Sequence, residues 1–432
     1  MLPTIGLVCD TAIFKMLSLA LLAAVAIPAV ATELPAGVIS VPLVRDYGLT
    51  AYFAEIQVGT PPQKTYLLVD TGSPYYSFLD PRNPVCATQS CKTFGTFDNT
   101  TSSYVLFCLI DPQIQTKTNR VCCRTCHDEG PGFYDHLSVL GNGDYLNDTI
   151  VLGNVTLKNM YFGYTSQYVK PVNVVGNVST ILGLSLDCQF GGPTCTYKGA
   201  VLLPELKNAS YIDAMSTSLY LGPDEVDVKN AQVLIGRAYD KAKVDGELFT
   251  VNMVDPHDLD LANGQTNSVN VSAIEVVLDG GNHTVETYGD KDVGVPVLLD
   301  SGIAAWYMTT TIFAAVYHGL GGQGDVPGGT RYVPIDCTYR NANHTRSYIS
   351  VAFGTAGTVK IPLSSLVSQF ADGTCGAFIQ ARGDKLSTMG DPFLRGVYSI
   401  FDQENFTVTL GRVKHTDVEE IVPIPAGGFK AS

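Results

Sequence analysis

Short stretches of alternating or continuous apolar residues run through most of the chain, and Gly, Pro or Asn interrupts them roughly every ten residues. TAYFAEIQVG at residues 50–59 and FTVTLG at residues 406–411 are examples. Alternation with a period of two is typical of strands that bury one face. Helical periodicity is confined to residues 309–320 and 362–370. The pattern therefore predicts an all-β protein, without the strand–helix alternation of a parallel α/β sheet.

Two apolar runs end in an acidic residue that is followed by a hydroxyl residue and glycine. They are LLVDTG at residues 67–72 and LLDSG at residues 298–302. Each run has a later apolar–glycine partner, STILG at residues 179–183 and STMG at residues 387–390. This repeated order indicates two related halves. We expect an N-terminal lobe of residues 32–205 and a C-terminal lobe of residues 206–432, each long enough to bury its own core.

Composition and charge restrict the class of partner. The chain is 45% hydrophobic and 16% charged, and its 41 acidic residues outnumber 27 basic ones, which gives a net charge of −14. This negative charge argues against nucleic acid as a partner. A small number of basic groups also suits a protein at acidic pH. Carboxyl groups are protonated and uncharged there, so the positive charges of Lys and Arg repel one another, and fewer such charges mean less repulsion.

The first 31 residues predict export. The apolar run at residues 19–31, LALLAAVAIPAVA, follows Lys15 and ends in small residues, which is typical of a secretory signal; Met16 is an alternative start. A buried N-terminal helix is the competing interpretation. No later apolar run has membrane length. We therefore expect a secreted, extracellular, monomeric glycoprotein with no integral membrane segment in its mature form. Nine Asn-x-Ser/Thr sequons support export: Asn99, Asn147, Asn154, Asn177, Asn208, Asn270, Asn282, Asn343 and Asn405.

Eleven cysteines are consistent with an oxidising compartment. Three candidate disulfides are Cys86 with Cys91, Cys188 with Cys195, and Cys337 with Cys375. Metal binding is the competing interpretation, but no Cys-x-x-Cys pair has a matching second pair. We expect no metal site.

Residues 107–123, FCLIDPQIQTKTNRVCC, differ in character from the rest of the chain. They have no clear period, and they contain three of the eleven cysteines. Two interpretations remain open: a surface insertion, or sequence translated from a non-coding gap in a gene.

Taken together, these motifs resemble the pepsin-like aspartic proteases, and within them the secreted fungal, candidapepsin-like members. The resemblance extends from about residue 52 to residue 411, and it includes YFAEIQVGTPPQ before the first acid and MGDPFLRGVYSIFD near the end. It implies an all-β fold with a cleft between two pseudo-symmetric lobes. It also implies polypeptide substrates and one catalytic acid from each lobe, Asp70 and Asp300.

The chemistry of two adjacent carboxyl groups supports this interpretation. Two carboxyl groups within about 3 Å cannot both ionise, so they share one proton over a wide pH range. The ionised group can activate a water molecule, while the protonated group donates a hydrogen bond to the peptide carbonyl oxygen. This mechanism needs no cofactor and no metal.

Five neighbours are expected to support the acids: Thr71, Gly72, Ser73, Ser301 and Gly302. The two glycines permit tight loops beside the carboxyl groups. The hydroxyl groups of Thr71 and Ser301 can bond to the backbone of the opposite loop and fix the separation of the acids. Ser73 can donate a hydrogen bond to Asp70.

Two departures from the family pattern keep a second function open. Ile303 stands where the family has Ser or Thr, and it cannot donate a hydrogen bond from its side chain, so we expect Asp300 to hold the proton of the pair. The candidate flap residue, Tyr134, is followed by Asp135 instead of Gly, and Tyr145 is a substitute; either tyrosine could instead pack between strands. The alternative is therefore a catalytically weak or inactive relative that binds peptide, protein or glycan in the cleft.

Overall fold

The computed structural model describes most of the chain after the expected signal segment. The described residues are 34–46, 50–88, 91–103, 106–107, 141–168, 179–186, 200–225, 228–255, 259, 266–279, 282–287, 294–324, 332–341, 346–370, 372–383 and 387–431. Tyr134, Cys188, Cys195 and residues 108–123 lie outside them, as does the signal segment. Within the described ranges, no helix has the length and apolar character needed to cross a membrane.

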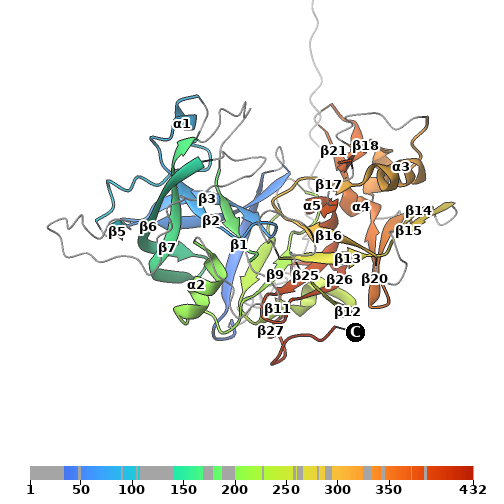
Figure 1. The fold of residues 1–432 in the computed structure, drawn as a ribbon. Helices are drawn as coiled ribbons and strands as arrows, with labels where there is room; N and C mark the ends of the chain where they lie inside the picture. The colour runs from blue at the N-terminus through green and yellow to red at the C-terminus, as the bar shows by residue number, and fades with distance from the viewer. Residues whose placement is uncertain are drawn as a thin grey trace, which may run out of the picture. The chain divides into compact units, whose positions relative to one another are not determined.

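A sheet of 13 strands contains segments from both halves of the chain (Figure 1). Its strands are β1 (Ile39–Asp46), β2 (Ala51–Val58), β3 (Gln63–Asp70), β4 (Ser77–Leu79), β5 (Leu106–Phe107), β6 (Gly141–Leu152), β7 (Val155–Tyr168), β8 (Ile181–Gly183), β9 (Ser216–Tyr220), β10 (Gln232–Ile235), β12 (Val244–Asn252), β25 (Val397–Asp402) and β26 (Thr407–Val413). Strand β10 of the C-terminal half pairs with β1 of the N-terminal half, so this sheet joins the two halves by backbone hydrogen bonds.

Four smaller sheets contain the remaining strands. The five-stranded sheet comprises β13 (Ser268–Val271), β16 (Val295–Leu299), β17 (Trp306–Met308), β23 (Ile379–Ala381) and β24 (Ser387–Met389). The four-stranded sheet comprises β14 (Ala273–Leu278), β15 (Asn282–Thr287), β19 (Tyr348–Phe353) and β20 (Gly357–Pro362). The three-stranded sheet comprises β18 (Val333–Pro334), β21 (Val367–Gln369) and β22 (Cys375–Ala377). The two-stranded sheet comprises β11 (Ala238–Asp240) and β27 (Ile421–Pro423).

Helices are few and short in the described residues, which agrees with the predicted all-β fold. They are α1 (Val85–Thr88), α2 (Leu202–Asn208), α3 (Thr310–Gly319), α4 (Leu363–Leu366) and α5 (Asp391–Leu394), with 3-10 turns η1 (Lys241–Lys243) and η3 (Cys337–Arg340).

One of the two helix predictions was right, and the other was partly wrong. Helix α3 lies within the predicted residues 309–320 and buries Phe313 and Val316. Of residues 362–370, only α4 is helical, because Val367–Gln369 forms strand β21 and pairs with β22. Tertiary pairing overrides local periodicity there.

The boundary expected between the halves, at residues 205 and 206, falls inside a helix that was not predicted. Helix α2 buries Leu202, Leu203 and Leu206, and it ends at Asn208 before β9 begins at Ser216. With seven residues, the helix is shorter than the window of about 11–18 residues in which helical periodicity is recognised in a sequence.

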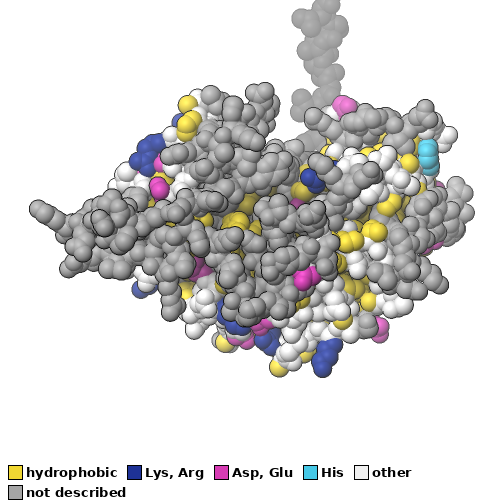
Figure 2. Space-filling model, in the orientation of Figure 1, with side chains coloured by type: hydrophobic (Ala, Val, Ile, Leu, Met, Phe, Trp, Pro, Cys, Tyr) yellow, Lys and Arg dark blue, Asp and Glu magenta, His cyan; other side chains and the backbone are white. Residues whose placement is uncertain are grey.

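The described charged side chains on the face drawn in Figure 2 are scattered among uncharged ones, and both signs occur close together. Lys207 of α2 pairs with Glu404, and Arg237 lies 3.8 Å from the same carboxylate. Exposed pairs of this kind contribute about 0–1 kcal/mol each. These exposed pairs therefore contribute little to the stability of the fold.

Candidate active site

Each candidate catalytic acid stands at the end of a buried strand that has a parallel neighbour. Asp70 ends β3, whose last residues pair with β8, with Asp70 opposite Gly183. Asp300 follows β16, which pairs in the same way with β24. These neighbours are the two apolar–glycine segments identified in the sequence. The backbone therefore repeats the same arrangement twice, with each acid carried on a rigid pair of strands.

Thr71 and Ser301 cross-link the two acid-bearing loops. The Thr71 hydroxyl donates to the Leu299 carbonyl oxygen at 2.9 Å and accepts from the Ser301 backbone N–H at 3.0 Å. Reciprocally, the Ser301 hydroxyl donates to the Val69 carbonyl oxygen at 2.8 Å and accepts from the Thr71 N–H at 3.1 Å. Both side chains are fully buried. Four hydrogen bonds thus hold the loops together without contribution from the acids themselves.

The two carboxyl groups are held in equivalent positions. The Gly72 N–H donates to Asp70 Oδ1 at 2.8 Å, and the Gly302 N–H donates to Asp300 Oδ1 at 2.8 Å. Asp70 is 5% exposed and Asp300 is 7% exposed. Each buried carboxyl group therefore accepts a hydrogen bond from one backbone N–H, and such bonds stabilise a negative charge on the pair.

Each glycine of the loops lies directly against the acid of the opposite loop. A Cβ atom placed on Gly72 would lie 2.4 Å from Asp300 Cγ, and one placed on Gly302 would lie 2.7 Å from Asp70 Cγ. Real Cβ atoms do not approach other atoms so closely. The requirement for glycine therefore arises from the close approach of the carboxyl groups across the pseudo-twofold axis.

The residues after the two glycines have different environments. Ser73 is half-buried, and its carbonyl oxygen accepts from the Ser185 N–H at 3.1 Å. The Ile303 carbonyl oxygen accepts from the Asp391 N–H at 2.9 Å and thereby fixes the start of α5. Ile303 therefore has a backbone role in placing the segment that begins α5.

Asp391 is a buried carboxyl group near the site that the sequence reasoning did not single out. It is fully buried, and neither carboxyl oxygen has a hydrogen-bond partner among the described residues. Burial raises its pKa well above the ordinary value; Arg395 and Arg45 oppose the rise, and the charge of Asp70 adds to it. An acid within an apolar segment, MGDPFL, is the sequence signal that could have identified it.

Asp224 connects three guanidinium groups. Its carboxylate lies 2.5 Å from Arg45, 3.3 Å from Arg340 and 3.5 Å from Arg395. Burial would raise the pKa of Asp224, but Arg395 and Arg45 outweigh it and the pKa is lowered. The cluster joins β1 to the segment after α5, and it is a buried ionic contact between distant parts of the chain.

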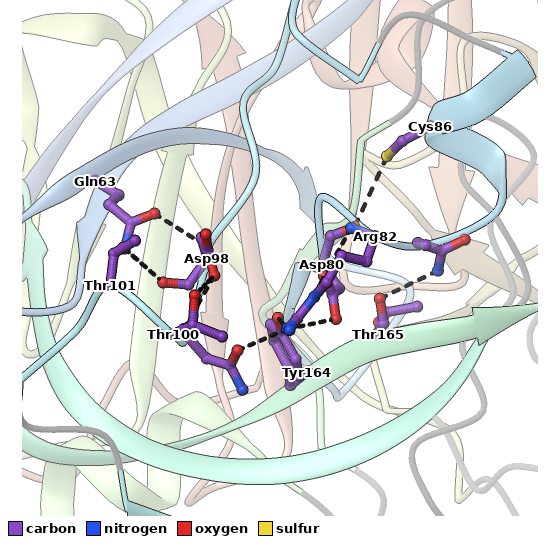
Figure 3. Close-up of polar contacts among 11 residues, drawn as sticks. Gln63, Asp80, Arg82, Cys86, Asp98, Thr100, Thr101, Tyr164 and Thr165 are labelled. Atoms are coloured by element: carbon purple, nitrogen blue, oxygen red, sulfur yellow. Dashed lines mark hydrogen bonds and ion pairs between the residues drawn. The ribbon is translucent and has the colours of Figure 1, made fainter.

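A second polar network fixes the chain that follows the first acid loop (Figure 3). Arg82 forms a two-pronged contact with Asp80, at 2.8 and 3.0 Å, and also donates to Tyr164 Oη and Asn99 Oδ1. Asn99 belongs to one of the sequons and is 8% exposed. The Cys86–Cys91 disulfide lies in the same segment. The network anchors the loop after β4 against β7.

The flap candidate Tyr134 lies outside the described residues, so its assignment stays a prediction. Tyr145, the substitute, lies on β6 and is 8% exposed. Its ring stacks on Tyr161 with the centroids 4.8 Å apart, and burial raises its pKa to about 12. Tyr145 is therefore a strand-packing residue.

Two of the three candidate cysteine pairs are bonded in the structure, Cys86–Cys91 and Cys337–Cys375. The third pair lies outside the described ranges. In the part of the chain that the structure covers, no group of three or more His, Cys, Asp or Glu side chains is arranged to hold a metal ion.

Two family models match the chain. The model described as eukaryotic aspartyl protease matches residues 135–413, which contain Asp300. The model described as xylanase inhibitor N-terminal matches residues 52–187, which contain Asp70. Together the two matches cover both acid-bearing loops.

Similar curated proteins come from fungi. Secreted aspartic protease 9 of Candida albicans is 30% identical over 69% of this chain, and this chain spans 52%, about half, of that protein's length. A probable aspartic-type endopeptidase opsB of Aspergillus oryzae is 26% identical over 86% of this chain and 70% of its own length. Aspartic proteinase yapsin-3 of Saccharomyces cerevisiae is 27% identical over 86% of this chain and 68% of its own length.

The predicted fold class is confirmed, since the β-rich architecture and the family match agree on the bilobal, pepsin-like fold. The aspartyl protease model covers more than half of the chain. The chain therefore belongs to the eukaryotic aspartyl protease family.

Proposed function

We propose that the protein is an aspartic endopeptidase that hydrolyses polypeptides at acidic pH through Asp70 and Asp300. The observation that carries the proposal is the reciprocal set of hydrogen bonds made by Thr71 and Ser301. With Gly72 and Gly302 packed against the opposite acids, this set holds two buried carboxyl groups face to face.

The proposed mechanism follows from the shared proton of the pair. The ionised carboxylate removes a proton from a bound water molecule, and the resulting hydroxide attacks the peptide carbonyl carbon. The protonated carboxyl group donates a hydrogen bond to the carbonyl oxygen as that oxygen gains negative charge. Proton transfer to the peptide nitrogen then permits the C–N bond to break, and the pair returns to its singly protonated state.

The decisive experiment compares the wild type with Asp70→Asn and Asp300→Asn. We expect the wild type to cleave an unfolded protein at acidic pH and a statine-type transition-state mimic to block cleavage. Both variants should lose activity by several orders of magnitude, because an amide can neither activate water nor share the proton. Asp213→Asn is the matched control, since it makes the same chemical change at an exposed carboxylate. Inhibitor-sensitive activity in Asp70→Asn would refute the proposal.

The proposed location is extracellular. The signal-like segment at residues 1–31 and the nine sequons support export, and one relative is itself named a secreted protease. Expression in a secreting host, followed by N-terminal sequencing of the protein in the medium, tests this. A protein retained inside the cells with residues 1–31 intact would contradict it.

A second candidate is a catalytically inactive binding protein. Two observations favour it: Ile303 replaces the hydroxyl residue expected after the second loop, and the N-terminal half matches the xylanase inhibitor model. A folded preparation that binds the statine-type mimic but shows no turnover between about pH 2 and pH 7 would establish this alternative.

A further inference from the structure

Thr266 and Asn267 form a second bridge between the two acid-bearing loops. The Asn267 side-chain amide donates to the Thr71 carbonyl oxygen at 2.7 Å, next to Asp70. The Asn267 carbonyl oxygen accepts from the Leu299 N–H at 3.1 Å, next to Asp300. One residue therefore contacts the immediate neighbours of both acids.

Thr266 extends the same bridge. Its backbone N–H donates to the Leu186 carbonyl oxygen at 3.1 Å, and its hydroxyl accepts from the Leu186 N–H at 2.9 Å. Leu186 lies three residues after Gly183 of the first apolar–glycine segment, and the N–H of Leu184, between them, donates to the Asp70 carbonyl oxygen. The bridge thus reaches the first acid loop from two directions.

The orientation of the Asn267 amide is fixed by its partners. A carbonyl oxygen only accepts hydrogen bonds, so the atom that faces Thr71 must be the nitrogen. The Asn267 oxygen then accepts from Gln403 Nε2 at 2.6 Å. Gln403 is 1% exposed, and its backbone N–H donates to the Met215 carbonyl oxygen at 2.9 Å. Gln403 therefore holds the amide in the orientation that serves Thr71.

The backbone conformation of Asn267 separates the role of its side chain from that of its backbone. Its φ angle is +73°, and the residue is fully buried. Glycine adopts this left-handed conformation more easily than asparagine does. A backbone requirement alone would favour glycine, so the amide accounts for the presence of asparagine at this position.

We propose that Asn267, oriented by Gln403, is a positioning residue that sets the relative placement of the two catalytic carboxyl groups. This inference rests on the proposed function of Asp70 and Asp300. It differs from the Thr71–Ser301 cross-link because Asn267 lies in a separate segment, immediately before β13, and bonds to the Thr71 backbone and not to its hydroxyl.

The pH dependence of the pair depends on how closely the two carboxyl groups are held. Coupling between two carboxyl groups separates their two apparent pKa values, and the coupling weakens as the groups move apart. Loss of the Asn267 bridge should therefore bring the two values together. The bell-shaped profile of kcat should become narrower, with the acidic limb moving to higher pH and the upper limb to lower pH.

The first test is Asn267→Gly, which keeps the left-handed backbone and removes the amide. We expect kcat to fall about three- to tenfold, which corresponds to the net contribution of one buried hydrogen bond. KM should stay within about twofold, because the substrate does not contact Asn267 in this scheme. The pH profile should narrow as described above.

Asn267→Asp provides a conservative rescue. A protonated carboxyl group can donate to the Thr71 carbonyl oxygen, whereas an ionised one cannot. The kcat of this variant should therefore be close to that of the wild type at the lowest pH values. As the pH rises and the introduced carboxyl group ionises, kcat should fall at a lower pH than it does in the wild type. Gln403→Met, which removes the orienting donor at similar size, should act like Asn267→Gly but more weakly, and it serves if Asn267→Gly does not fold.

Thr409→Val is the matched control, because it removes a buried hydrogen bond, 2.8 Å to Thr250, in the β12–β26 pair away from the acids. It should lower stability without moving either limb of the profile. If Asn267→Gly behaves like this control, or has wild-type kcat and profile, the inference is overturned. The pH dependence of binding of the statine-type mimic reports the same two pKa values without turnover. If the wild type is inactive, the proposed function is overturned, but binding of the mimic still measures the two pKa values. The comparison of Asn267→Gly with the wild type then remains decisive.

Discussion

Glu205 should make the protein less stable as the pH rises from about 4.5 to about 7. It lies on α2 with its side chain half-buried, and burial raises its pKa from 4.5 to about 7, although a hydrogen bond from the Tyr161 backbone opposes the rise. Between these two pH values the folded protein binds more protons at this site than the unfolded chain does. The free energy of unfolding must therefore decrease as the pH increases.

The size of the effect follows from the shift in pKa. A rise from 4.5 to about 7 corresponds to roughly 3 kcal/mol at about 1.4 kcal/mol per pKa unit. Partial exposure of the side chain reduces this value through solvent screening. We expect Glu205→Gln, which resembles the protonated form at every pH, to match the wild type near pH 4. At pH 7.5 it should be more stable by about 1–3 kcal/mol.

The assay is urea denaturation over a series of pH values. An Asp70→Asn background prevents self-digestion at acidic pH. Glu247→Gln, which removes an exposed carboxylate, controls for the change in net charge. A stability difference between Glu205→Gln and its parent that stays constant from pH 4 to pH 7.5 would refute the reasoning, as would a control that reproduces the gain.

Three further predictions concern the site and its support. Asp224→Asn should lower the free energy of unfolding by about 3–5 kcal/mol in urea denaturation, because it leaves buried guanidinium groups uncompensated; a loss below about 1 kcal/mol would contradict this. Gly302→Ala should abolish turnover while the protein stays folded by circular dichroism, because its Cβ would collide with Asp70; near-normal activity would contradict the close approach. Ile303→Thr adds a hydroxyl that can donate to ionised Asp300, so the pH optimum should move down by roughly one unit in the pH–rate profile. A shift to higher pH would show that the expected roles of the two acids are reversed.

Local sequence patterns determined the type of element and the most constrained motifs. The period-two alternation predicted strands because only side chains on one face of a half-buried strand need to be apolar. The recurrence of Asp-Thr/Ser-Gly and of apolar–glycine segments predicted two equivalent loops, and β3 with β8 repeats the pairing of β16 with β24. These features are readable because each lies within a few consecutive residues.

Tertiary structure decided the features that depend on residues far apart in the chain. Residues 367–369 became a strand because β22 was available to pair with them, although their local pattern favoured a helix. Asn267 reaches Thr71 across 196 positions, and Gln403 reaches Asn267 across 136. No periodicity links such positions, because a hydrogen bond depends on distance in space and leaves no regular spacing in the sequence. The sequence thus determined the two acids and their loops, whereas the folded chain decided which buried amide and which buried charges support those loops.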